Sequence, residues 1–291
     1  MPVFRSFLFA PGNHPRRVEK CLTLGADAVI LDLEDAVANA EKAGTRAVVV
    51  QALSAPRRCQ GYVRVNALGT QWCHGDFMAV VAEGVDGIVL PKVEGAGDLQ
   101  TAEWLLAALE RERGLPEGGI DLIPIIETGA GYSNIKAIAA AARRTRRLAF
   151  GAGDFTLDVG ITWSREETEL LPYRTAFVVE SRAAGLEPPV DTVWVSLKDP
   201  EGFAASVRRA RDLGFQGKLC IHPDQVPVVN ECFRPTDAQI AQARKVVDAF
   251  AQAERDGLAA IQVDGQFVDY PIVYRAQRLI ARADAIAAAQ R

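Results

Sequence analysis

The chain has 291 residues, of which 49% are hydrophobic and 24% are charged, and its formal net charge is −4. This is an ordinary globular composition, which excludes disordered, collagen-like and fibrous chains, and the slight acidic excess argues against nucleic acid or an anionic membrane surface as the main partner. No apolar stretch approaches the roughly 18 residues of a membrane span, and no secretory leader is recognisable. Five cysteines without a CxxC pair argue against a zinc site. We therefore expect a cytoplasmic protein.

Eight short apolar segments, each followed by a helical pattern, run along the first three quarters of the chain. Their spacing allows one strand, one helix and two short loops per unit, which predicts parallel strands joined by helical crossovers. Eight such units favour a closed (β/α)8 TIM barrel over an open doubly wound sheet, whose first turn would carry GxGxxG rather than APGNHP. The segments start near Phe4, Ala28, Tyr62, Gly87, Asp121, Arg147, Thr192 and Gly217.

The residues after the eighth strand predict a helix, a hairpin and a second helix. The capping box TDAQ at 236–239 opens the first helix, Asp-Gly at 264–265 suits the two-residue turn of the hairpin, and an alanine-rich helix begins near Ile272. This extension is too small for an independent core, so we expect it to pack as a lid on the barrel or on a neighbouring subunit. The predicted domains are therefore a barrel at 1–223 and an extension at 224–291.

Polar side chains stand where the predicted strands end, which is where barrel enzymes place their active sites. Several carboxylates meeting in one mouth repel each other unless a cation lies among them, and oxygen ligands suit Mg2+ or Mn2+. Each acid alone could instead cap a helix or a turn, but Arg64 inside an apolar strand needs an anionic partner. The strand-end residues are Asp32, Glu34, Asp35, Arg64, Asn66, Lys92, Glu94, Glu127, Asp154 and His222.

Two basic clusters and the histidines give weaker signals. The three histidines are scattered and give no Ser/His/Asp order. Arg16, Arg17 and Lys20 on the first helix are typical of a solvated face, although phosphate contacts at the barrel mouth would need such residues. The arginine-rich run 143–147 precedes the sixth strand, at the opposite end of the barrel, and we interpret it as surface charge.

Eight segments, in order and over nearly the whole chain, resemble the HpcH/HpaI aldolase–citrate lyase superfamily. The likeness is to the branch that contains the citrate lyase beta subunit and the malyl-CoA and citramalyl-CoA lyases. The segments are RSFLFAPGN (5–13), AVILDLEDAV (28–37), VRVN (63–66), GIVLPKVE (87–94), PIIET (124–128), FGAGDFTLD (150–158), GKLCIHPDQV (217–226) and VDGQFVDYPIV (263–273).

The resemblance implies a metal and substrate site in the barrel mouth. Glu127 and Asp154 would bind Mg2+, with Mn2+ as an alternative, and Glu127 would also contact the substrate. Arg64 would be both a substrate-binding and a catalytic residue that holds the keto or hydroxy acid. The backbone amides near Ala152 and Gly153 would bind the carboxylate of the substrate.

Further roles follow from the same resemblance. Glu34 and Asp35 would order water on the metal, and Asp35 is also counted among the catalytic residues. Asp269, in the motif VDYP, would be the catalytic acid/base that the lid of a neighbouring subunit delivers, which implies a homotrimer or a multiple of one. Arg5, with the basic side of the first helix, is the candidate contact for coenzyme A.

The implied activity is Mg2+-dependent carbon–carbon lyase chemistry on a 3-hydroxyacyl-CoA thioester such as malyl-CoA, citramalyl-CoA or citryl-CoA. The products would be a keto acid and an acyl-CoA, and the same site could run the synthesis or hydrolyse the thioester. Two alternatives stay open: a class II aldolase on free pyruvate-type keto acids, and the beta subunit of a citrate lyase complex that acts on an acyl-carrier-protein thioester.

Overall fold

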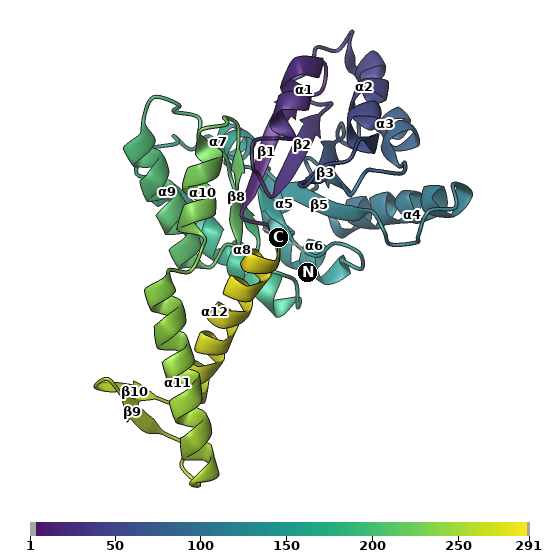
Figure 1. The fold of residues 1–291 in the computed structure, drawn as a ribbon. Helices are drawn as coiled ribbons and strands as arrows, with labels where there is room; N and C mark the ends of the chain where they lie inside the picture. The colour runs from purple at the N-terminus through teal and green to yellow at the C-terminus, as the bar shows by residue number, and fades with distance from the viewer. Residues whose placement is uncertain (1–3, 290–291) are drawn as a thin grey trace. The chain divides into compact units, whose positions relative to one another are not determined.

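The computed structural model describes residues 4–289, and it divides them into two compact units (Figure 1). Residues 4–230 form the first unit and the chain from Glu231 onward forms the second, so the division lies a few residues after the boundary predicted at 223/224. The predicted domains also include residues 1–3 and 290–291, which lie outside the described residues.

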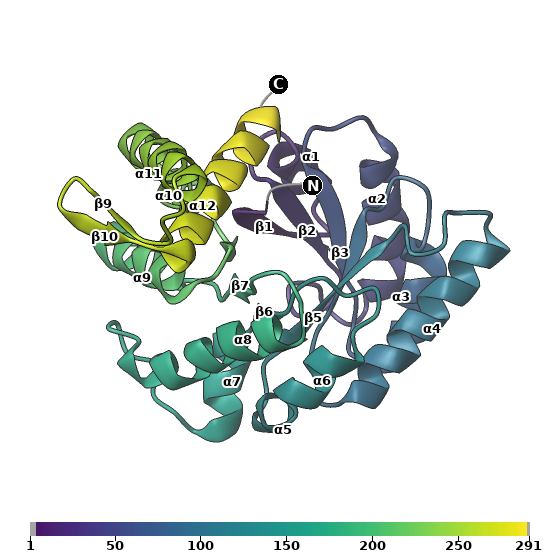
Figure 2. The same cartoon turned by 90° about the horizontal axis from the view of Figure 1, so that it is seen from below.

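The first unit is a closed barrel of eight parallel strands in chain order, which confirms the predicted TIM barrel. The ring closes where β1 pairs with β8, with Ser6 opposite Lys218, and helices lie outside the strands (Figure 2). The strands are β1 (Ser6–Pro11), β2 (Ala28–Asp32), β3 (Gln60–Arg64), β4 (Gly87–Leu90), β5 (Asp121–Ile126), β6 (Ala149–Phe150), β7 (Val190–Asp191) and β8 (Gly217–Cys220).

The helices of this unit follow the strands as the spacing predicts. They are α1 (Pro15–Cys21), α2 (Lys42–Ser54), α3 (Cys73–Val80), α4 (Ala96–Glu112), α5 (Gly129–Ser133), α6 (Ile135–Ala141), α7 (Ala152–Val159), the 3-10 turn η1 (Thr168–Leu170), α8 (Leu171–Ala183) and α9 (Pro200–Leu213), while α10 (Gln225–Cys232) runs across the division between the units.

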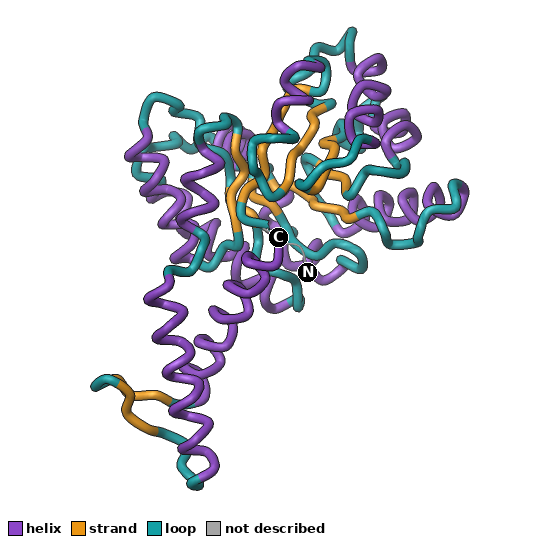
Figure 3. Tube along the Cα trace, in the orientation of Figure 1, coloured by secondary structure: helices purple, strands orange, loops and turns teal. Residues whose placement is uncertain are grey.

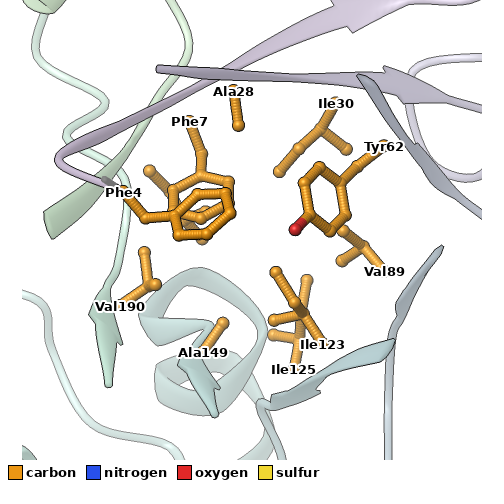
Figure 4. Packing of buried hydrophobic residues seen from close by; sticks show 11 residues of the cluster. Phe4, Phe7, Ala28, Ile30, Tyr62, Val89, Ile123, Ile125, Ala149 and Val190 are labelled. Atoms are coloured by element: carbon orange, nitrogen blue, oxygen red, sulfur yellow. The ribbon is translucent and has the colours of Figure 1, made fainter. Parts of the chain in front are cut away.

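The strands are apolar on both faces because both faces are buried. All five residues of β2 are buried, with Ile30 in the barrel interior and its neighbours on the helix side. Figure 4 shows the interior, where side chains from opposite strands point toward one another. This cluster includes Phe7, Tyr62, Val89 and Ile123, and it fills the barrel as a packed core rather than a pore.

The sixth strand is shorter than the apolar pattern predicts, and the prediction of a seventh strand from Thr192 is wrong in position. The seventh strand ends at Asp191, before the predicted TVWVSL segment. Trp194 explains the difference, because its indole donates a hydrogen bond to Ser196 and its carbonyl accepts one from Gln225. Side-chain hydrogen bonds therefore replace ladder bonds in this segment.

The interpretation of run 143–147 as surface charge is wrong for two of its four arginines. Arg144 forms an ion pair with the buried Glu110. Arg147 is 1% exposed, forms ion pairs with Asp121 and Glu187, and its guanidinium lies 4.1 Å from the centre of a phenylalanine ring. Both arginines lie at the end of the barrel opposite the predicted mouth, Arg147 beside Asp121 at the start of β5 and Arg144 on the carbonyl of Ile120 just before it.

The second unit contains α11 (Asp237–Arg255), the hairpin strands β9 (Ile261–Val263) and β10 (Gln266–Val268), and α12 (Tyr270–Ala289). The two helices lie side by side (Figure 3), and the predicted capping box at the start of α11 is present. The turn Asp264-Gly265 has φ values of 50° and 78°, as a type I′ turn requires.

The expectation that this extension has no core of its own is wrong. Valines of the hairpin pack with Phe250 and other helix residues, and the cluster comprises Ala243, Val246, Phe250, Val263, Val268, Val273 and Ala276.

All five cysteines are free thiols. Across residues 4–289, no helix is both long enough and apolar enough to span a membrane.

Candidate active site

The mouth of the barrel brings the predicted polar residues together because parallel strands end at the same side. Asp32 and Arg64 are the last residues of β2 and β3. Lys92 and Glu127 follow β4 and β5 within two residues, and Asp154 lies in the first turn of α7, directly after β6. Side chains from five successive strands therefore converge on one place.

Arg64 is held by acidic side chains on two sides. Its Nε and Nη2 donate to the two carboxylate oxygens of Asp32 at 2.7 and 2.6 Å. Its Nη1 lies 3.0 Å from Glu34 and 3.7 Å from Asp35, and the ring of Phe9 lies 5.0 Å from the guanidinium carbon. A buried guanidinium held in this way is a fixed positive charge.

The Asp32 carboxylate also orders the loop that follows its own strand. It accepts hydrogen bonds from the amides of Glu34 and Ala36. Burial by itself raises the pKa of Asp32, but Arg64 and these amides outweigh that effect and hold the pKa below its ordinary value. For Glu34 burial prevails over Arg64, and its pKa is raised.

Lys92 contacts four of the site's carboxylates, three through its ammonium and one through its backbone amide, although no role was predicted for it. Its ammonium lies 2.7 Å from Glu34, 3.2 Å from Asp154 and 3.8 Å from Asp35. Its backbone amide donates to Oε1 of Glu127 at 2.9 Å. The residue has a φ of 53°, a left-handed conformation that is uncommon outside glycine. The one signal for it in the sequence is a lysine directly after an apolar strand.

Glu127 is 4% exposed and lies among other carboxylates. Burial, followed by the charges of Glu34 and Asp154, raises the pKa of Glu127 to about 8. A Cβ on Gly151 would lie 2.4 Å from Oε2 of Glu127, so the absence of a side chain at Gly151 lets this carboxylate sit against β6.

This donor set fits Mg2+. No group of three or more His, Cys, Asp or Glu side chains among residues 4–289 is arranged to hold a metal. Mg2+, however, is commonly bound through one or two carboxylates, with water and substrate completing its shell. Glu127 and Asp154 both contact Lys92, and after burial the neighbouring carboxylates of Glu34 and Asp154 also raise the pKa of Glu127, a repulsion that a bound cation would relieve.

The amides at the start of α7 differ from the prediction in part. The Ala152 amide donates to Oγ1 of Thr192 at 2.9 Å, and Ala152 is fully buried, so this amide already has a partner inside the protein. No hydrogen bond from the Gly153 amide is found within the described part of the chain. The N-terminus of a helix attracts anions, and Gly153 remains the predicted contact there.

Arg5 lies away from this cluster, and Asp269 belongs to the other unit. Arg5 directly precedes β1, at the opposite end of the barrel, where its guanidinium bonds Asp27 at 2.7 and 2.8 Å and donates to the carbonyl of Asn230. It therefore ties the chain together at that end and is not brought to the site. Asp269 belongs to the second unit, where its carbonyl accepts the Val273 amide and its carboxylate lies 3.4 Å from the Ile272 amide at the start of α12.

Comparison with known proteins identifies the family. Residues 5–223 match the model of the HpcH/HpaI aldolase/citrate lyase family. The chain belongs to this family. The predicted membership is confirmed, and with it the prediction of an enzyme of the lyase type.

Curated and solved relatives cover nearly the whole chain. A citrate lyase subunit beta of Leuconostoc mesenteroides subsp. cremoris is 38% identical over 97% of this chain and 93% of its own. A (3S)-malyl-CoA thioesterase of Cereibacter sphaeroides is 36% identical over 98% and 96%. The crystal structure of protein CitE from Mycobacterium tuberculosis in complex with magnesium, acetoacetate and coenzyme A has a TM-score of 0.77 at 30% identity, over 97% and 98% of the two chains.

Proposed function

We propose that the protein is a Mg2+-dependent carbon–carbon lyase that cleaves a 3-hydroxyacyl-CoA thioester into a keto acid and an acyl-CoA. The observation that carries the proposal is the convergence of five carboxylates around Arg64 and Lys92 at the barrel mouth. The relatives that act on CoA thioesters, and a solved relative that binds magnesium with coenzyme A, support the substrate class and the metal.

The side chains divide the chemistry between them. Glu127 and Asp154 would hold the metal, which when bound supplies a Lewis acid for the hydroxyl and carboxylate oxygens of the substrate. Arg64 places positive charge near the oxygen that becomes the keto group. The Gly153 amide, at the start of α7, would bind the substrate carboxylate, while Glu34 and Asp35 order water around the metal.

Cleavage also needs a group that moves one proton, and we assign that role to Asp269. In the cleavage direction the substrate hydroxyl loses its proton as the bond between the two carbons breaks and the keto group forms, and the acyl-CoA carbon takes up a proton. In the synthetic direction the same carboxylate removes that proton. Attack of water on the thioester would instead release free CoA, as in a thioesterase.

A subunit-mixing experiment tests both the role of Asp269 and its delivery from a second copy. Arg64→Ala and Asp269→Asn should each abolish turnover, since each removes one half of the site. Mixed oligomers of the two inactive variants should recover up to about a quarter of the wild-type activity, because one subunit then supplies an intact barrel and another an intact Asp269. Full activity of Asp269→Asn would contradict its role. No recovery in mixed oligomers would contradict delivery between subunits.

The substrate is identified by incubating the protein with malyl-CoA, citramalyl-CoA and citryl-CoA, with and without Mg2+, and following the products by mass spectrometry. Metal-dependent release of a keto acid and a shorter acyl-CoA is the expected result, with Glu127→Gln as the inactive control. Free CoA with the intact hydroxy acid would indicate a thioesterase. No turnover of any of the three would contradict the proposal and favour the free keto-acid aldolase.

A second candidate is a subunit of a citrate lyase complex, which the 38% identity to a citrate lyase subunit beta favours. In that case the substrate thioester would be carried by an acyl carrier protein. Turnover of a citryl thioester on an acyl carrier protein, with none of citryl-CoA, would establish it.

A further inference from the structure

The geometry points to Lys92 as a positioning residue of the site. Its ammonium forms an ion pair with Asp154 in the metal-free enzyme and releases Asp154 when Mg2+ binds. This inference rests on the metal part of the proposed function. It starts from the position of Lys92, whose ammonium lies 3.2 Å from Asp154 and 2.7 Å from Glu34. The proposed function counts Lys92 among the charges of the mouth but gives its side chain no step in the reaction.

The charge balance of the mouth explains why such a cation is needed. Two of the three guanidinium nitrogens of Arg64 donate hydrogen bonds to Asp32. The charge of the arginine is therefore paired mainly with the carboxylate at the end of β2. Asp154 and Glu127 have no ion pair with Arg64 among the described residues. Among the described residues, the Lys92 ammonium forms the ion pair with one proposed metal ligand, Asp154, while the neutral backbone amide of Lys92 bonds the other, Glu127.

The backbone of Lys92 fixes this arrangement. Its left-handed φ of 53° costs conformational energy that surrounding contacts must offset. One such contact is the hydrogen bond of 2.9 Å from its amide to Oε1 of Glu127. Because the side chain is about one-third exposed, the ammonium can swing away from Asp154 and stay paired with Glu34. Metal binding is then an exchange of one cation for another.

The test measures Mg2+ affinity of the full-length protein by isothermal titration calorimetry. Lys92→Met keeps the length of the side chain and removes its charge, so the competing cation is lost, and we expect the Kd for Mg2+ to fall by at least about tenfold. Lys92→Arg keeps the charge and should stay within about threefold of the wild type. Lys136→Met, on an exposed position of α6, is the matched control for loss of a surface charge.

Thermal unfolding with and without Mg2+ distinguishes this role from a purely structural one, because a structural loss would lower the melting temperature in both conditions. Without metal, Lys92→Met should melt at a lower temperature than the wild type, by about 2–4 °C, because the carboxylates lose their counter-charge. Saturating Mg2+ should remove that difference. A deficit that persists in Mg2+ would indicate a structural role and overturn the inference.

The outcomes separate this inference from the proposal on which it rests. An unchanged or weaker Mg2+ affinity in Lys92→Met, with normal binding by the wild type, would overturn the role of Lys92 alone. Absence of Mg2+ binding by the wild type would overturn the proposed metal site as well. If Lys92→Met fails to fold, Lys92→Gln provides the same comparison, because it also lacks the charge and can still donate to Glu34.

Discussion

Asp32 and Arg64, the last residues of two neighbouring strands, lie opposite each other in the register of the sheet and are joined by two hydrogen bonds of 2.7 and 2.6 Å. Strand pairing thus aligns the backbones, and the side chains complete a bidentate ion pair at the barrel mouth. The register of β2 and β3 therefore orients the Arg64 side chain, and with it the position of the guanidinium charge at the mouth.

Asp32→Asn should therefore damage both stability and activity. The substitution leaves a buried guanidinium without its bidentate partner, and we expect a loss of about 3 kcal/mol in the free energy of unfolding with at least about a tenfold fall in kcat/KM. Urea unfolding and steady-state kinetics measure the two effects. Asp35→Asn is the control for stability, because the Asp35 side chain is 57% exposed and 3.7 Å from Arg64. A wild-type unfolding curve for Asp32→Asn would contradict the role.

Gly151→Ala should displace Glu127. The new Cβ would lie 2.4 Å from the carboxylate oxygen of Glu127 and 2.6 Å from its Cβ, and this contact is too close for the glutamate to keep its place. We expect the Mg2+ affinity to fall by at least about tenfold, because one of the two proposed protein ligands moves. Gly153→Ala is the matched control, since its added Cβ would meet no atom nearer than 3.9 Å. Equal Mg2+ affinities for the two variants would refute the argument.

Thr192→Val should destabilise the start of α7, although valine has nearly the same side-chain shape as threonine. The threonine hydroxyl accepts the Ala152 amide at 2.9 Å, and valine leaves that buried amide without a partner. The expected cost is about 1–3 kcal/mol, measured by thermal unfolding. Thr192→Ser keeps the hydroxyl and should recover most of that stability. If both variants cost the same, the loss comes from packing and not from the hydrogen bond.

Asp191 makes the stability of the barrel depend on acid pH. It is fully buried between Arg174 and Lys218. Burial raises its pKa, but the two cations outweigh burial and hold the pKa below the ordinary value. Because a lowered pKa favours the folded state only while the carboxylate is ionised, this contribution is complete above the unfolded-state pKa of about 3.9 and is lost as the pH falls below it.

Asp191→Asn should remove that dependence along with about 3–5 kcal/mol of stability, since two buried cations lose their partner. The measurement is the free energy of unfolding between pH 3 and pH 7 for the wild type and the variant. Asp212→Asn, at an exposed position of α9, is the control. Parallel pH profiles for the wild type and Asp191→Asn would contradict the assignment.

The sequence predicts the barrel and most of its mouth because both depend on local pattern. Apolar runs at regular spacing specify the strands, and an acid or base that follows a strand must lie at its C-terminal end. Arg64, a charge inside an apolar strand, predicts an anionic partner, and the structure pairs it with Asp32, Glu34 and Asp35. Arg5, by contrast, precedes its strand, and this position alone predicts that it lies at the end of the barrel opposite the mouth.

Long-range pairing explains what the sequence could not predict. Nothing near Lys92 in the chain indicates that its ammonium meets Glu34, 58 residues earlier. Arg147 likewise lies in a run of arginines whose local pattern predicts solvated side chains, whereas its ion-pair partners, Asp121 and Glu187, come from distant parts of the sequence. Thr192 lies in an apolar run that predicts a strand, whereas in the structure its hydroxyl accepts a hydrogen bond from the Ala152 amide at the start of α7.

The wall of the barrel is not equally strong all the way round. β1 and β2 are aligned over five residue pairs, whereas β6 and β7 share a single pair, Ala149 with Val190. Amide hydrogens on this side should therefore exchange with solvent sooner than those of β1 and β2. Gly153 lies three residues after β6 and Thr192 directly follows β7. We therefore expect local opening to be more frequent at this side of the mouth than at Arg64, which ends the five-residue strand β3.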